Sequence, residues 1–358
     1  MRGRLQSLPV QRLLAYAATV ATVALSCVIY WLGPYNADQL QARYGPPRFL
    51  FTGSQFLFAA AAGYALLLAP YFLVRSDPEA CKSLRFFEVA LRFARSPRAT
   101  LAGHLSHESR VAVLATLLKM FFAPLMAMQL MNFCVGALAN GHAILHFGLT
   151  VDDLRSMFDR YIFWLVLQAI LFIDVLIFTV GYLVESPRLG NQIRSVDPTL
   201  RGWAVALLCY PPFNIVTGAV LGSSTSDFPR FDDTTIHLTM NVMLLCLMLV
   251  YASAAVSLGW KASNLTHRGI VTRGAYAFVR HPAYTCKNLA WWIGAVPIVS
   301  AAFAQSVLGG LQALMSVAGL TALYLLRALT EEDHLRGVDG DYASYAKRVK
   351  YRFIPGVV

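Results

Sequence analysis

The chain has 358 residues, of which 57% are hydrophobic and only 14% are charged. An average soluble domain is about 45–50% apolar and about 25% charged, so this composition excludes both an ordinary cytosolic enzyme and a disordered protein. The formal net charge of +11 would suit nucleic-acid binding. The basic residues follow a membrane topology instead, and no base-reading motif accompanies them, so no nucleic acid is expected as a partner.

Eight apolar segments are each long enough to cross a bilayer as a helix. They lie near residues 13–33, 49–74, 111–138, 161–184, 202–222, 236–259, 288–305 and 308–326. In lipid, every backbone N–H and C=O group must be bonded internally, and the alternating polarity of strands is absent. The sequence therefore predicts an all-α, polytopic membrane helix bundle of about eight transmembrane helices, with the last two joined at Gly309–Gly310.

The distribution of basic residues supports this topology. Loops that alternate onto one side of the bundle carry 24 of the 30 Lys and Arg residues, the opposite loops carry 5, and Lys119 lies inside a segment. Cytoplasmic loops are enriched in Lys and Arg, so the N and C termini are both predicted to be cytoplasmic. We expect a multi-pass integral membrane protein of the bacterial inner membrane, in contact with membrane lipids. The sequence predicts no oligomeric state.

The chain divides into two regions of different character. Residues 1–200 contain apolar segments and one basic stretch, 79–98, where apolar residues recur at helical spacing between Arg and Lys. This stretch predicts an amphipathic helix in the cytoplasmic interface, within an N-terminal transmembrane region of unassigned role. Residues 201–358 carry the dense polar segments and form the predicted functional core, which ends in a C-terminal ligand-binding segment.

Three polar segments surround the last two apolar segments on the predicted cytoplasmic side. They are residues 267–276, 280–284 and 327–355. Two consecutive helices that form a hairpin enter and leave on the same face, so Arg280 and His281 are expected near Glu331 and Glu332. A pocket lined by both basic and acidic side chains is therefore predicted at this end of the bundle.

The same segments offer partners for a ligand with a flat ring and a carboxylate. Tyr276 and Tyr284 are suited to line an adenine-sized slot, and the backbone amides of the loop 269–274 can donate to a carboxylate. Each residue alone is also typical of an interfacial anchor or a helix end that faces water. The joint spacing of the residues is what favours a binding site.

Five motifs follow one another between about residues 260 and 356. They are Gly274-Ala275-Tyr276, Arg280-His281-Pro282-Ala283-Tyr284, Glu331-Glu332, Tyr342-Ala343-Ser344-Tyr345 and Arg352-Phe353-Ile354-Pro355. Their order, with a helical hairpin between the second and third, resembles the isoprenylcysteine carboxyl methyltransferase family. That family lies within a wider group of integral-membrane methyltransferases that includes phospholipid N-methyltransferases.

The resemblance implies an integral-membrane methyltransferase that uses S-adenosylmethionine as its cofactor. It implies the following cofactor contacts: Arg268, Gly269, Ile270, Val271, Tyr276, His281, Pro282, Ala283, Tyr284, Glu331 and Glu332. Arg327 matches the family arginine that faces the anionic group of the substrate, so Arg327 and Glu331 are the catalytic candidates. A lipophilic acceptor would enter from the bilayer and the cofactor from the cytoplasm. Prenylcysteine, an isoprenoid or fatty acid, an amine headgroup and a small thiol all remain possible acceptors.

The chain departs from the family pattern near the start of the seventh apolar segment. Cys286 stands where the family often has glycine, and Lys287 and Asn288 follow it. Arg268 replaces a commoner His or Lys at the start of the loop. These polar residues alter the mouth of the predicted pocket and with it the class of substrate.

Two other functions fit part of the pattern. Sterol C14-type reductases share an R-H-P-x-Y element and a similar hairpin but use NADPH, which makes a sterol or isoprenoid reductase the alternative enzyme. A non-catalytic transporter or membrane component is the second alternative, because Lys119 and Asp174 are ionisable residues inside apolar segments.

Lys119 and Asp174 lie at matching predicted depths on consecutive antiparallel helices, so we expect them to form a structural ion pair. No metal site is expected: the six cysteines show no metal-ligand spacing, and the histidine pairs lack further ligands.

Overall fold

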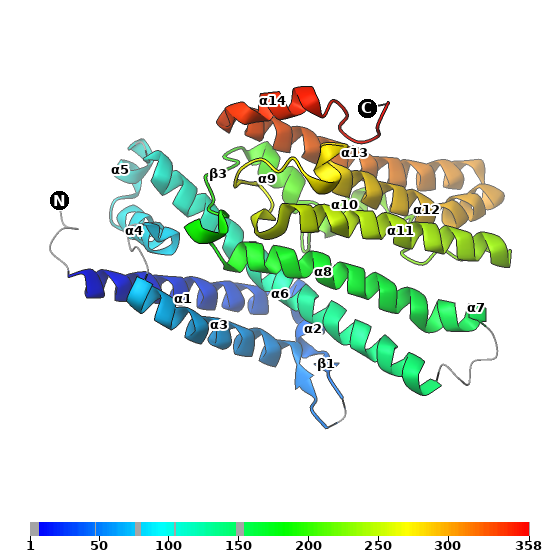
Figure 1. The fold of residues 1–358 in the computed structure, drawn as a ribbon, viewed down its shortest axis with the longest axis horizontal. Helices are drawn as coiled ribbons and strands as arrows, with labels where there is room; N and C mark the ends of the chain where they lie inside the picture. Colours follow the sequence, from blue (N-terminus) through cyan, green and yellow to red (C-terminus); the bar gives the residue numbers. More distant parts are fainter. Residues whose placement is uncertain (1–6, 47, 76–79, 104, 148–153, 358) are drawn as a thin grey trace. The chain divides into compact units, whose positions relative to one another are not determined.

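The computed structural model describes residues 7–46, 48–75, 80–103, 105–147 and 154–357, and these residues are mostly helical (Figure 1). The chain forms two compact units, which are described separately. The first comprises Met1–Gln129 and Ile193–Val196, and the second comprises Leu130–Gln192 and Asp197–Val358. The division at residue 200 is based on where the sequence motifs lie. It stays a prediction about the functions of the two parts of the chain.

In the first unit, α1 packs against α3 and against the basic helix α4. The elements of this unit are α1 (Leu8–Leu32), a 3₁₀ turn (Pro34–Asn36), α2 (Ala37–Gln41), β1 (Arg43–Tyr44), β2 (Phe51–Thr52), α3 (Gly53–Arg75), α4 (Lys82–Arg95), α5 (Pro97–Ala102), the first part of α6 (His107–Phe147) and β3 (Ser195–Val196). The strands β1 and β2 form an antiparallel pair. The helix predicted near 79–98 is present as α4, with Val89 buried; its place in the membrane interface stays a prediction.

The second unit contains the remaining elements. They are the rest of α6, α7 (Leu154–Met157), a π-helical turn (Phe158–Ile162), α8 (Phe163–Leu183), a 3₁₀ turn (Pro187–Leu189), α9 (Leu200–Leu207), α10 (Asn214–Leu221), α11 (Thr234–Leu258), a 3₁₀ turn (Gly259–Lys261), β4 (Thr266–His267), a 3₁₀ turn (Gly274–Ala277), α12 (Pro282–Gln305), α13 (Val307–Val338) and α14 (Gly340–Arg348). Apolar side chains of α8 and α11 form the core of this unit, and Ala290 of α12 joins them.

Seven helices within the described part of the chain are long and apolar enough to cross a membrane. They are Leu8–Leu32, Gly53–Val74, His107–His146, Arg155–Leu183, Thr234–Lys261, Pro282–Gln305 and Val307–Val338. This confirms an all-α polytopic membrane bundle. The eighth predicted helix, 202–222, is not continuous: it is divided into α9 and α10, each of eight residues. Pro211 and Pro212 lie between them, and proline both removes a backbone donor and clashes with the preceding turn.

The segment between α8 and α11 nevertheless runs from one end of the second unit to the other. Asp159 and His237, near the starts of α8 and α11, are 2.9 Å apart, and Tyr251 donates to Asp174 at 2.8 Å farther along both helices. The helices α8 and α11 therefore run in the same direction, as Figure 1 shows. Two parallel helices need a connection that returns along the bundle, so the segment 184–233 leads from the end of α8 back to the start of α11 as a broken path.

Helices α9 and α10 of this broken path pack against α13, and the extended residues that follow bond to α12. Thr225 donates to the carbonyl oxygen of Trp291 at 2.8 Å, and the Ser226 amide donates to the carbonyl of Gly294 at 3.2 Å. A Cβ atom on Gly294 would lie 2.1 Å from the carbonyl oxygen of Ser226, so only glycine allows this approach.

The helices α12 and α13 form the predicted hairpin, but the turn lies earlier than expected. It is at Ser306, whose hydroxyl accepts a hydrogen bond from the Gly309 amide at 3.0 Å and so caps α13. Gly309 and Gly310 lie in the first turn of α13. A Cβ atom on Gly310 would lie 2.1 Å from the Phe303 ring, so this glycine serves close helix packing rather than the turn.

Candidate functional site

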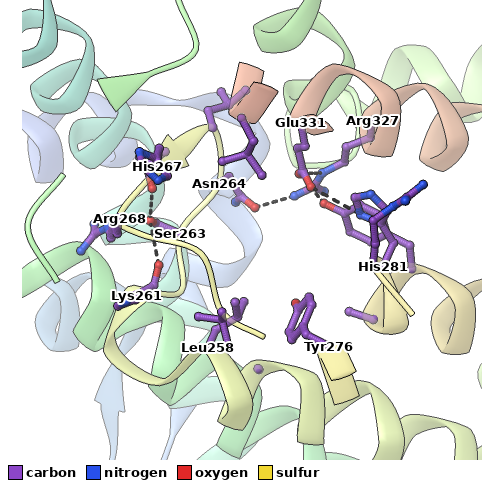
Figure 2. Close-up of a pocket in the computed structure, with 18 of the residues that line it drawn as sticks. Leu258, Lys261, Ser263, Asn264, His267, Arg268, Tyr276, His281, Arg327 and Glu331 are labelled. Carbon is purple, nitrogen blue, oxygen red and sulfur yellow. Dashed lines mark hydrogen bonds and ion pairs between the residues drawn. The ribbon is translucent and has the colours of Figure 1, made fainter. Parts of the chain in front are cut away.

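The second unit encloses a cavity of about 200 Å³ between its helices and the segment 258–276. Figure 2 shows Asn264, His267 and Arg268 on one side of it and Arg327 and Glu331 on the other. The cavity wall includes the following residues that the sequence predicted: Arg268, Gly269, Ile270, Val271, Tyr276, His281, Ala283, Tyr284, Arg327 and Glu331. The structure thus brings together all the predicted site residues except Pro282 and Glu332.

We call the part lined by residues 261–276 the loop end of the cavity. Its segment is fixed by close contacts to α8 and to the loop that follows α8: a Cβ atom on Gly181 of α8 would lie 2.1 Å from the carbonyl oxygen of Ala262. The Asn191 side chain donates to the Trp260 carbonyl at 3.2 Å. The backbone of Leu265 has φ +60°, a conformation that a branched side chain rarely adopts. This segment is therefore held in one specific path along the cavity.

Arg268 is the buried cation of the loop end, with 2% of its surface exposed. Its Nη1 donates to the Asn191 carbonyl at 2.8 Å, whereas Nε and Nη2 are buried without a hydrogen-bond partner in the structure. Burial lowers the pKa of the guanidinium, and the nearby charge of Glu185 opposes that effect. An arginine remains charged under such a shift, so Arg268 presents two unused donors side by side.

Tyr276 completes the loop end from a segment that α14 holds in place. The Tyr345 hydroxyl donates to the Tyr276 carbonyl at 2.9 Å. Burial raises the pKa of Tyr345 to about 12, and burial together with the negative charge of Glu331 raises the pKa of Tyr276. Both phenols therefore stay neutral hydrogen-bonding groups at physiological pH.

Glu331 lies between the loop end and the deeper part of the cavity. Its Oε1 accepts a short hydrogen bond from the Tyr284 hydroxyl and one from Arg327 Nε at 3.3 Å, while Oε2 is 4.0 Å from His281 Nδ1. The rings of His281 and Tyr284 are nearly parallel, with centroids 5.5 Å apart. Pro282, between them, is buried as the first residue of α12 and sets the direction of that helix.

Arg327 is buried in the middle of the cavity wall. Its Nη2 donates to Asn264 Oδ1 at 2.5 Å, a bond that joins the loop segment to α13 (Figure 2). Three tyrosine rings surround the guanidinium, with centroids 5.1–5.8 Å from its central carbon. They are Tyr210, Tyr284 and Tyr324. These contacts fix the orientation of Arg327 and exclude water from its faces.

Glu332 does not take the place that the family resemblance implied. It is fully buried, and its carboxylate contacts four cationic or ionisable side chains instead of the cavity. They are Arg280 at 2.9 Å, His281 at 3.2 Å, Arg352 at 3.2 Å and Arg336. Residues 280 and 281 also pair with the C-terminal segment through backbone bonds to Tyr351 and Arg352. Adjacent residues on a helix point about 100° apart, which is why Glu331 reaches the cavity and Glu332 does not.

The deeper part of the cavity, which we call the helix end, was not predicted as a site. It is lined by Asp174 of α8, Tyr251 of α11, Lys287 of α12 and Tyr324 of α13. One signal was present in the sequence: Tyr324, Arg327 and Glu331 recur at helical spacing and so share one face of α13. The contribution of α8 and α11 depends on their parallel packing, which no local pattern reveals.

The expected partner of Asp174 was Lys119. The structure gives Asp174 the Tyr251 hydroxyl as a hydrogen-bond partner at 2.8 Å. Lys119 belongs to the first unit and Asp174 to the second, so the pairing stays a prediction.

Comparison with known proteins supports one family. Residues 235–336, which include nearly all of α11, all of α12 and most of α13, match the model of the isoprenylcysteine carboxyl methyltransferase family. No curated protein and no solved structure gives a significant match to the chain. The matched segment supplies Tyr276, His281, Arg327 and Glu331 to the cavity. Residues 235–336 thus resemble the isoprenylcysteine carboxyl methyltransferase family, the family that the sequence motifs indicate, within a chain that carries seven helices long and apolar enough to cross a membrane among its described residues.

Proposed function

We propose that the protein transfers a methyl group from S-adenosylmethionine to a lipophilic acceptor that reaches the cavity from the bilayer. The observation that carries this proposal is Arg268, a buried cation in the cavity wall whose Nε and Nη2 have no hydrogen-bond partner. These two donors form the edge of a guanidinium that binds a carboxylate in bidentate fashion. A buried donor without a partner is unfavourable, so the site is complete only with a bound acceptor of hydrogen bonds.

The other residues of the cavity fit the same cofactor. The carboxylate of Glu331 suits an ammonium group, and it is 28% exposed at the cavity. The neutral phenol of Tyr276 and the paired rings of His281 and Tyr284 suit a flat purine. When bound, the cofactor supplies an electrophilic methyl group on a positively charged sulfur.

The protein contributes mainly by positioning the reactants and excluding water. Arg327 is held by Asn264, Glu331 and three aromatic rings, so it can orient an acceptor without first reorganising. An in-line displacement is accelerated when the protein holds the reactants in a fixed orientation and excludes water from the site. The chain therefore needs no nucleophile of its own at this site, and Cys286 has no part in the proposal.

Calorimetric titration of the full-length protein with S-adenosylhomocysteine, and separately with NADPH, tests this proposal. We expect binding of S-adenosylhomocysteine and about a tenfold loss of affinity in R268M, because a charge-assisted hydrogen bond contributes roughly 1.5–3 kcal/mol. R273M is the matched control, since Arg273 is exposed on the same loop. Binding of NADPH alone would instead favour the reductase.

The acceptor is found by a second experiment. Transfer of a radiolabelled methyl group from S-adenosylmethionine to a total lipid extract should label a lipid in the wild type and not in R327M. Label confined to water-soluble compounds would contradict a lipophilic acceptor.

A further inference from the structure

The helix end of the cavity holds two opposite charges that are not paired with each other. Asp174 Oδ2 accepts a hydrogen bond from the Tyr251 hydroxyl at 2.8 Å. Lys287 Nζ lies 5.8 Å from the centroid of the same tyrosine ring. Within the described part of the chain, no ion pair of 4.0 Å or less joins Lys287 to a carboxylate. Tyr251 thus stands between an acid and a base that both line the cavity.

Aromatic rings hold the Lys287 ammonium. Its Nζ is 5.2 Å from the ring centroid of Trp291 and 5.6 Å from that of Tyr324, in addition to Tyr251. Ring faces attract a cation without neutralising it, so the ammonium keeps its full charge at the cavity. Tyr324 also contacts Arg327, and Arg327 already has Glu331 as its carboxylate partner. Lys287 is therefore a separate cation with a separate role.

Asp174 and Lys287 lie deep along their helices, where two charges without a direct ion pair are unfavourable unless a ligand binds to them. Asp174 lies about 13 Å along α8 from Leu183, and Lys287 about 7 Å along α12 from Pro282. Both are on membrane-spanning helices, where isolated charges are expensive and a direct ion pair reduces that expense. Here the Tyr251 hydroxyl bonds to Asp174 and the ring cage contacts Lys287, and no direct ion pair of 4.0 Å or less joins the two charges among the described residues. A cavity that presents one positive and one negative group at separate points complements a ligand with the opposite arrangement.

The cofactor does not need this arrangement. Under the proposed function, its carboxylate is matched by Arg268 at the loop end and its ammonium by Glu331. The helix end is the part of the cavity formed by transmembrane helices, from which a lipid would arrive. On this basis, which rests on the proposed function, we infer that the acceptor is a lipid with a zwitterionic headgroup, whose acidic group binds Lys287 and whose ammonium group binds Asp174.

Three probes of sixteen carbon atoms each test this inference: 2-aminohexadecanoic acid, hexadecanoic acid and hexadecylamine. Binding to the full-length protein in nanodiscs is followed by tryptophan fluorescence, with W291F used to isolate the signal of the ring cage. We expect the zwitterion to bind about tenfold more tightly than either single-charge probe, because it forms one additional charge-assisted contact. K287M should remove the advantage over the amine, and D174N the advantage over the acid. The exposed Lys347 supplies the control K347M, which should bind like the wild type.

The outcomes separate this inference from the proposed function. The probes need no cofactor, so their binding can be measured even if S-adenosylhomocysteine does not bind. Equal affinity of the three probes would overturn the zwitterionic headgroup. A loss of S-adenosylhomocysteine binding in K287M would also overturn it, because the subsite would then hold the amino-acid part of the cofactor. If D174N does not fold, Y251F replaces it: without the intervening hydroxyl the two charges can pair, and the advantage of the zwitterion should fall.

Discussion

The neighbouring residues Glu331 and Glu332 belong to two regions with opposite electrostatic character. Around Glu332, Arg280, His281, Arg336 and Arg352 form a closed cluster in which the protein itself supplies every partner. In the cavity, Arg268 has unused donors, and no ion pair of 4.0 Å or less joins Lys287 to a carboxylate in the described part of the chain. Buried charges that the protein pairs fully hold the fold together, whereas those left incompletely paired are available to a ligand.

The largest expected difference between the two regions appears when each carboxylate is exchanged for its amide. E332Q should lower the free energy of unfolding by about 3–5 kcal/mol, because removing one member of a buried charge cluster leaves the others uncompensated. E331Q should lower it much less and should instead weaken S-adenosylhomocysteine binding about tenfold. Thermal unfolding in detergent and calorimetry measure the two effects. Equal stability of the two variants would show that the distinction between the regions is wrong.

A smaller effect is expected where the C-terminal helix supports the loop end. Y345F removes the hydrogen bond to the Tyr276 carbonyl, worth about 1 kcal/mol. The pKa of Tyr345 is raised to about 12 in the folded protein, whereas it is about 10 in an unfolded chain. Its contribution to stability is therefore complete below pH 10 and is lost as the pH rises towards 12. The difference in the free energy of unfolding between wild type and Y345F should shrink between pH 9 and pH 12.

The smallest effect concerns Lys119 and Asp174. A double-mutant cycle with K119M and D174N measures their coupling free energy. Because the Tyr251 hydroxyl already bonds to Asp174, we expect the predicted pair to give a coupling of only about 0.5 kcal/mol. Residues in contact give roughly 0.5–3 kcal/mol, and a value in that range would establish the pair predicted from the sequence.

The sequence predicts well what depends on local pattern. Apolar length predicts the long helices, and the motif order places Arg268, Tyr276, His281 and Glu331 at one cavity. The hairpin turn is predicted at a glycine pair but lies at Ser306, because a capping hydroxyl ends the turn and Gly310 is used for packing instead.

Tertiary arrangement accounts for what the sequence does not predict. Which of two adjacent glutamates faces a cavity depends on the rotation of α13 against its neighbours. Asp174 and Tyr251 meet only because α8 and α11 are parallel, and that follows from a connection whose apolar sequence conceals its break at Pro211 and Pro212. Neither the rotation of α13 nor the parallel packing of α8 and α11 can be predicted from the length and hydropathy of the segments.

The broken path between α8 and α11 has a consequence for biogenesis. Each of α9 and α10 is about 12 Å long, far short of a hydrocarbon layer of about 30 Å. Backbone groups beyond them are bonded by α12: the Ser226 amide reaches the Gly294 carbonyl. Because unbonded backbone groups are not tolerated in lipid, this segment cannot settle in the membrane alone. We therefore expect this segment to settle only once α12 and α13, which follow it in the chain, are in place, and a residue larger than glycine at position 294 to impair folding.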